Sequence, residues 1–138
     1  MAITVAWDDE AQTIVRMVLD DTWDLAAFRD ASYQCMALIR TVSHLVYVLS
    51  YVTLPPTIPY GLLWQLRDLN QMRPPNWGGG IAIARDSFVT TLVATLSQIY
   101  MERQKQRLFV VTSEAEGYEI IVKLKQQDEK SSDGTKTT

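Results

Sequence analysis

His44 is the only histidine in the chain, and Ser43 stands directly before it. A serine nucleophile needs a histidine base within hydrogen-bond distance, and the base needs an orienting carboxylate. Residues adjacent in sequence seldom face each other in that geometry. His44 also follows a helical segment, where a capping or solvent-exposed role is common for this residue type. We therefore expect no catalytic residue here and predict that the chain is not an enzyme.

Cys35 is the only cysteine, so neither an internal disulfide nor a zinc site built from cysteines can form. It stands in an apolar helical stripe, which is typical of a small buried hydrophobic side chain. A reactive thiol would need a nearby cation to lower its pKa. The first five residues do not resemble a secretion signal, and the apolar run Leu45–Val52 is too short to span a membrane. We expect a reducing, cytoplasmic setting.

Two further patterns have the composition of ligand sites. Clustered carboxylates can bind magnesium or calcium, but their spacing here matches no calcium loop, and turns and helix caps use the same residue types. Gly78–Gly80 has the glycine content of a phosphate loop, yet it follows a helix and opens a strand, which is the reverse of that motif. We predict a turn at these glycines, with no metal and no cofactor. The acidic residues concerned are Asp8, Asp9, Glu10, Asp20, Asp21 and Asp24.

Charge and size restrict the function classes. The net charge of −3 argues against nucleic acid as the main partner, because neutralising phosphates requires a basic face. Arg103, Lys105 and Arg107 do cluster, but they follow a helical run, where cations complement the helix dipole. An anion site is the alternative for these three residues. A chain of 138 residues with 47% hydrophobic residues is typical of one domain with its own core.

The spacing of apolar residues predicts the elements that hold these side chains. Alternation over residues 3–7 and 13–19 predicts two strands joined by a polar turn, in an antiparallel hairpin. Asp24 or Thr22 can cap the helix that follows. The nearly continuous apolar run Leu45–Val52 is typical of a central strand buried on both faces.

The second half of the chain alternates helices and strands. The same spacing rules predict a helix at 60–72, a strand at 81–84, a helix from Asp86 or Ser87 to Tyr100, and a strand at 108–111. Ser113 and Glu116 match a capping box at the start of a fourth helix. From Gln126 onward the chain is polar and lacks an apolar anchor, so we predict an α/β domain over 1–125 and a disordered polar tail over 126–138.

This order of elements resembles the STAS domains, the fold of the bacterial anti-sigma-factor antagonists, over Ile3–Leu124. It implies a single-domain α/β fold, with a mostly parallel mixed sheet of about five strands, a leading hairpin and four helices. In that family an Asp-Ser-Ser-Gly-like motif opens the helix after the central strand, and its first serine is a phosphorylation switch. The matching residues here are Ile58-Pro59-Tyr60-Gly61, followed by Leu62.

Gly61 and Leu62 match the family pattern, but Ile58 replaces the acidic residue and Pro59 replaces the switch serine. Proline in a first helical turn fixes φ and has no hydroxyl to phosphorylate. The resemblance therefore implies a regulatory interaction module that lacks the serine switch. Thr57 and Tyr60 supply nearby hydroxyls, which we interpret as loop packing in preference to a regulatory role.

Aromatic, methionine and proline side chains gather in the connections that flank the helix predicted at 60–72. Such residues often mark a contact surface, although packing at the edge of a core uses them too. We predict a non-catalytic interaction module that binds a protein partner or a second copy of itself. Its predicted contact residues are Tyr51, Pro55, Pro56, Thr57, Pro59, Tyr60, Trp64 and Trp77. Alternatively, the same aromatic set lines a pocket for a small apolar ligand or lipid, as in a carrier or sensor.

Overall fold

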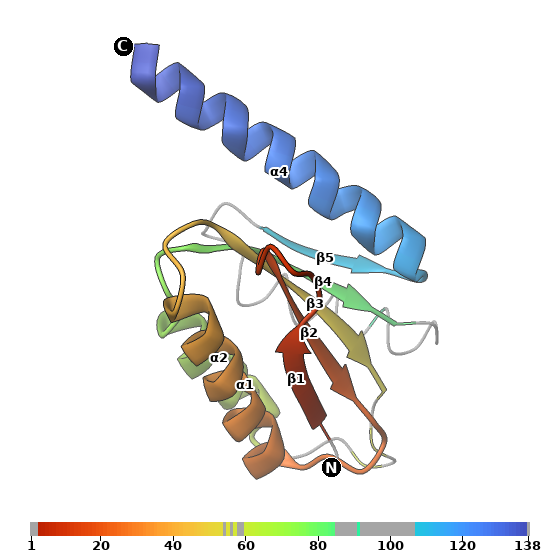
Figure 1. The fold of residues 1–138 in the computed structure, drawn as a ribbon. Coiled ribbons are helices and arrows are strands. Elements are labelled where there is room, and N and C mark those ends of the chain that lie inside the picture. Colours follow the sequence, from red (N-terminus) through yellow and green to blue (C-terminus); the bar gives the residue numbers. More distant parts are fainter. Residues whose placement is uncertain are drawn as a thin grey trace.

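The computed structural model describes residues 3–53, 55, 57, 60–84, 91 and 107–137. Five strands form one mixed sheet in the order β1-β2-β3-β4-β5 (Figure 1). β1 is antiparallel to β2, and the other neighbouring pairs are parallel, as the sequence predicts for a leading hairpin followed by crossovers. The strands are β1 (Ile3–Trp7), β2 (Ile14–Leu19), β3 (Val46–Val52), β4 (Trp77–Ile83) and β5 (Leu108–Val111).

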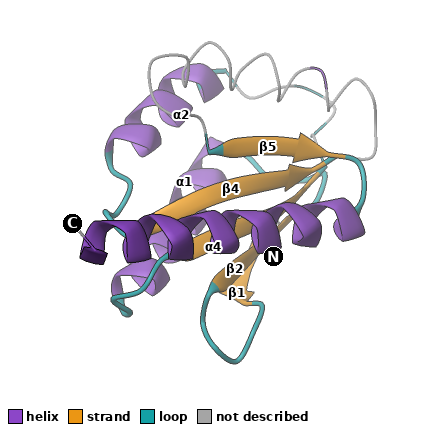
Figure 2. Cartoon of the chain, turned by 90° about the horizontal axis from the view of Figure 1, so that it is seen from above, coloured by secondary structure: helices purple, strands orange, loops and turns teal. Residues whose placement is uncertain are grey.

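Helices cover both faces of this sheet. α1 (Leu25–Arg40) packs on β1 and β2 and also contacts α2 (Leu62–Gln71), whereas α4 (Glu114–Thr137) lies over β4 and β5. Seen from above in Figure 2, α4 crosses in front of the strands and the other two helices lie behind them. The helix predicted from Asp86 or Ser87 to Tyr100 lies outside the described residues, apart from Thr91, whose backbone is helical.

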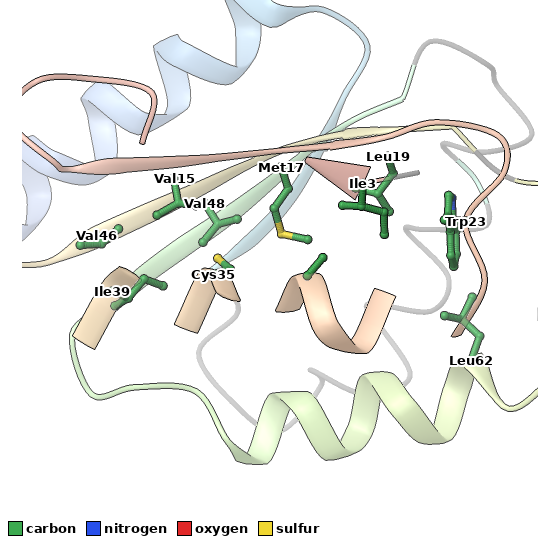
Figure 3. Close-up of a cluster of buried hydrophobic side chains, with 11 residues drawn as sticks. Ile3, Val15, Met17, Leu19, Trp23, Cys35, Ile39, Val46, Val48 and Leu62 are labelled. Atoms are coloured by element: carbon green, nitrogen blue, oxygen red, sulfur yellow. The ribbon is translucent and has the colours of Figure 1, made fainter. Parts of the chain in front are cut away.

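The face toward α1 and α2 holds the larger apolar cluster. Alternate residues of β1, β2 and β3 point down onto α1, and Leu62 joins them from α2 (Figure 3). Asp24 caps α1 by accepting a hydrogen bond from the Ala27 N–H at 2.8 Å, which fixes where this helix begins. The buried members are Ile3, Val15, Met17, Leu19, Trp23, Ala31, Cys35, Ile39, Val46, Val48 and Leu62.

Among the described residues, α4 is the helix that covers the opposite face. Ile121 and Leu124 of this helix pack on the alternate residues of β3, β4 and β5. β3 is therefore buried on both faces at the centre of the sheet, which confirms the prediction from its apolar run. The buried members of this second cluster are Ile14, Tyr47, Leu49, Ile81, Ile83, Val111, Ile121 and Leu124.

The predicted turn at Gly78–Gly80 is wrong, because these glycines lie inside β4. A Cβ atom at Gly78 would come within 2.7 Å of Cε1 of Tyr47, and one at Gly80 within 2.8 Å of Cδ2 of Leu108. The glycines are thus needed for close approach of side chains from neighbouring strands, which is a second reason for glycine in a strand.

α4 does not end near Leu124, where the apolar stripe stops, but continues as helix to Thr137. The helix therefore passes through the polar segment after Gln126, which we expected to be a disordered tail. At its start, the Ser113 hydroxyl oxygen accepts a hydrogen bond from the Glu116 N–H at 3.2 Å, so this half of the predicted capping box is formed. The division of the chain at residue 125 stays a prediction.

Candidate functional site

The start of α2 places two aromatic side chains in solvent. Gly61 has a left-handed backbone, with φ of 87°, directly before the first helical residue. Leu62 then enters the core, and Trp64 lies about 200° further around the helix, on the outer side. Trp64 is 64% exposed, and Tyr60, on the outer side of the glycine turn, is 97% exposed. We call these two residues the Tyr60–Trp64 surface.

Tyr51 and Trp77, two of the other predicted contact residues, pack against the apolar clusters of the sheet. Tyr51 packs with the cluster under α4, whereas Trp77 packs on the opposite face of the sheet, where its ring lies 4.1 Å from the Arg73 guanidinium. Pro55 is half-buried and Thr57 is exposed, and Pro56 and Pro59 lie outside the described residues. Tyr51 and Trp77 therefore lie on opposite faces of the sheet and do not line one cavity together.

A polar cluster that the sequence did not indicate lies between α4 and the first two strands. The Tyr118 hydroxyl donates to Oδ2 of Asp8 at 2.7 Å, and Nη1 of Arg16 lies 3.8 Å from Oδ1 of Asp8. The Arg16 guanidinium also covers the ring of Tyr51, 4.6 Å from its centroid. We call Asp8, Arg16, Tyr51 and Tyr118 the Asp8 cluster. The Asp8 side chain is only 10% exposed, so these contacts replace most of its water.

Electrostatics keep the two phenols of this cluster neutral. Burial, and then the hydrogen bond to Asp8, raise the pKa of Tyr118. Burial and the neighbouring Glu114 carboxylate raise the pKa of Tyr51, although no hydrogen bond of normal geometry joins the buried Tyr51 hydroxyl to a partner. Neutral phenols donate hydrogen bonds and are poor bases, so the cluster acts as a polar contact that joins α4 to β1 and β2.

A second polar contact holds α4 near the opposite edge of the sheet. Asp128 receives two hydrogen bonds from Nη2 of Arg107, at 2.9 and 2.8 Å, and one from the Tyr47 hydroxyl. Nε of Arg107 also donates to the Gly78 carbonyl oxygen. We call Tyr47, Arg107 and Asp128 the Asp128 latch. Arg107 therefore pairs with a carboxylate, whereas Arg103, Lys105 and the helix end whose dipole we expected these cations to complement lie outside the described residues.

Cys35 and His44, whose side chains are of types that often act in catalysis, both make contacts that support the fold. Cys35 is buried, and burial raises the pKa of its thiol to about 12, so its interpretation as a small hydrophobic side chain is confirmed. Nε2 of His44 lies 2.8 Å from the carbonyl oxygen of Gln12, a turn residue with φ of 58°. The imidazole must donate to this carbonyl. His44 therefore contacts the turn between β1 and β2 from an exposed position, which agrees with the solvent-exposed role that we considered, whereas the C-cap of α1 is Thr41.

Asp9 and Asp20 make local hydrogen bonds, as the helix cap Asp24 does, whereas Asp8 accepts from the distant Tyr118. Asp9 accepts from the backbone N–H groups of Thr13 and Ile14, at 2.8 and 3.1 Å, and Asp20 accepts from Thr22 at 2.8 Å. They close turns in the manner usual for aspartate. In the part of the chain that the structure describes, no three His, Cys, Asp or Glu residues are placed to hold a metal ion.

Comparisons with protein-family models, curated proteins and solved structures find no match to this chain. The resemblance to STAS domains therefore rests on the order of elements and on the Gly61-Leu62 helix opening. Over the residues that the structure describes, each helix is too short or too polar to cross a membrane.

Proposed function

We propose that this chain is a non-catalytic interaction module of STAS-like type that works without a serine phosphorylation switch and binds a protein partner through the Tyr60–Trp64 surface. One observation carries the proposal. Two large aromatic side chains, 97% and 64% exposed, stand four residues apart at the start of α2, where Gly61 turns the chain and holds them outward.

Exposed aromatic side chains such as Tyr60 and Trp64 contribute little to the core and are well suited to binding a partner. Tyrosine and tryptophan are enriched among the residues that dominate interface energies, because each buries a large rigid area and can make one hydrogen bond. Arg67 and Asp68 are exposed on the next turn of α2 and supply charged groups beside the aromatic pair. An apolar centre with a polar rim is the usual composition of a protein interface.

The alternative of a small apolar ligand gains no comparable support. A carrier or sensor of this type would need the aromatic side chains to converge on one concave space. Tyr51 and Trp77 lie on opposite faces of the sheet, and Tyr60 projects into solvent. The interaction proposal therefore takes precedence.

The test is partner capture with a matched control. We expect Tyr60→Ala and Trp64→Ala each to weaken binding of a partner recovered from the native cell extract by about thirtyfold, or about 2 kcal/mol. Tyr33→Ala removes an aromatic side chain on α1 that is 44% exposed and should leave binding unchanged. All three variants should keep wild-type stability within about 0.5 kcal/mol, measured by urea unfolding.

Affinities are best measured with the purified partner by calorimetry, so that expression differences do not matter. A partner that binds wild type and both α2 variants equally would overturn the proposal, as would equal loss of binding in the Tyr33→Ala control.

A further inference from the structure

β1 is the first strand in the order of the sheet and lies at one of its edges. β2 is the only strand that pairs with β1 among the described residues, and α1 covers one of its faces. Its sequence, Ile-Thr-Val-Ala-Trp, contains no proline, glycine or charged residue. Natural proteins usually protect an edge with such residues or with a bulge, because unpaired backbone groups bind other strands. None of these protections is present within Ile3–Trp7.

The direction of the backbone hydrogen bonds shows which residues face this edge. The Asp8 N–H donates to the Ile14 carbonyl at 2.8 Å, and Ala6 and Thr4 continue the same alternation opposite Arg16 and Val18. In an antiparallel pair, the residues between these positions point their N–H and C=O groups away from the partner strand. These residues are Ile3, Val5 and Trp7.

We propose that β1 pairs antiparallel with β1 of a second copy of this chain, around a two-fold axis at Val5. In this register Val5 pairs with Val5 of the second copy, and Ile3 pairs with Trp7 of the second copy. Each pair then forms two backbone hydrogen bonds, from N–H to C=O in both directions. The two five-stranded sheets then form one continuous sheet, with α1 of both copies on the same side.

Side chains and charge favour this arrangement. Thr4 and Ala6 are exposed on the face of β1 that points away from α1. In the dimer, Thr4 of each copy lies opposite Ala6 of the other copy. Both are small and uncharged, so neither repulsion nor a steric clash opposes pairing. The acidic turn at Asp8 and Asp9 lies at opposite ends of the shared strand pair, whereas a parallel arrangement would bring the two turns together.

This dimer is independent of the proposed function, because β1 contributes nothing to the Tyr60–Trp64 surface. A single strand pair buries less area than a permanent interface, so the dimer should be reversible and depend on concentration. If the dimer is not observed, the proposal that a partner binds the Tyr60–Trp64 surface is unaffected. If no partner binds that surface, the dimer proposal is likewise unaffected.

The first test is Val5→Pro, followed by analytical ultracentrifugation. The Val5 N–H points outward, so proline removes a donor from the dimer and leaves the bonds between β1 and β2 in place. We expect wild type to dimerise at tens of micromolar or above and Val5→Pro to associate about tenfold more weakly. Val5→Thr keeps the donor and the branched shape, so it should associate within about threefold of wild type.

The second test fixes the register and does not rely on proline being tolerated. Thr4→Lys/Ala6→Lys and Thr4→Glu/Ala6→Glu each place like charges across the pair and should be monomeric alone, whereas their mixture should form a one-to-one dimer. Circular dichroism checks that each variant is folded. Wild type that is monomeric to about 200 μM, or a dimer that neither Val5→Pro nor the like-charge variants weaken, would overturn the proposal.

Discussion

The two faces of the sheet are closed in different ways. α1 and α2 cover the first face through an apolar cluster, in which residues such as Val15 and Ile39 are fully buried. α4 covers the second face with only two buried aliphatic side chains, Ile121 and Leu124, and adds polar contacts along its length.

The difference shows that holding a helix against a sheet and fixing its position along the sheet can depend on different interactions. Apolar packing is non-directional, so two aliphatic side chains would hold α4 on the sheet without fixing where it lies along its own axis. Tyr118 donates to Asp8, Lys125 donates to Thr13 at 2.8 Å, and Asp128 accepts from Arg107 and Tyr47. A shift of one turn would break all three contacts and leave charged or buried groups unpaired. The polar contacts therefore fix the position of α4 along its own axis, whereas apolar packing holds it against the sheet.

Truncating the apolar face should have the largest effect. Ile39→Ala leaves a cavity among β2, β3 and α1, and we expect a loss of about 3 kcal/mol in the free energy of unfolding, measured with urea. Tyr33→Ala on the same helix is the control and should cost less than about 0.5 kcal/mol. A loss of less than about 1 kcal/mol for Ile39→Ala would mean that burial does not hold this face.

Breaking the Asp128 latch should cost less. Asp128→Ala leaves the Arg107 guanidinium and the Tyr47 hydroxyl without their shared partner, and we expect a loss of about 1–2 kcal/mol. Glu129→Ala, at the exposed neighbouring position, should be close to neutral.

Hydrogen exchange gives the local readout for the latch. Asp128→Ala should speed exchange in α4 after Lys125 and leave exchange in α1 as in wild type, because the contact is local. Equal acceleration in both helices would show that α4 is not held separately and would remove the contrast between the two faces.

The smallest effect is a pH dependence confined to the α4 face. The pKa of Tyr118 is raised in the folded state by burial and by Asp8, and that of Tyr47 by burial and by Asp128. The folded state therefore holds protons that the unfolded state begins to lose near pH 10, the ordinary pKa of tyrosine. Stability present below about pH 10 should decline as the pH rises further.

Tyr118→Phe removes one of these groups and should make the decline shallower. The measurement is urea unfolding between pH 8 and pH 11, and the double variant with Tyr47→Phe should be shallower still. Superimposable curves for wild type and both variants would show that neither phenol is coupled to folding.

Local sequence patterns predicted most of the fold. Alternation gave the bounds of β1 and the inner face of β2, and the uninterrupted apolar run placed β3 at the centre of the sheet. Trp64 stands one position off the stripe formed by Leu62, Leu66 and Leu69, which predicts a place on the flank of this helix, and its side chain is 64% exposed. These predictions succeed because each depends only on residues a few positions apart.

The polar contacts could not be predicted in the same way. Tyr118 and Asp8 are 110 residues apart, and Tyr47 and Asp128 are 81 apart, so no local spacing relates them. The glycines of β4 were misread because a turn and a close approach select the same residue. The sequence did contain one indication of these contacts: residues 47 and 51 are an even number of positions apart in β3, so the two tyrosines lie on the same face of the sheet.

The three consecutive glycines of β4 also affect how the chain becomes ordered. Each glycine loses more backbone freedom than another residue would, by roughly 0.5–1 kcal/mol relative to alanine. This strand therefore has little tendency to extend by itself. Its order is conferred by the Tyr47 ring over Gly78 and by the hydrogen bond from the Gly80 N–H to the Arg107 carbonyl at 2.8 Å. We expect β4 to become ordered only after β3 provides a template, and therefore later than the hairpin of β1 and β2.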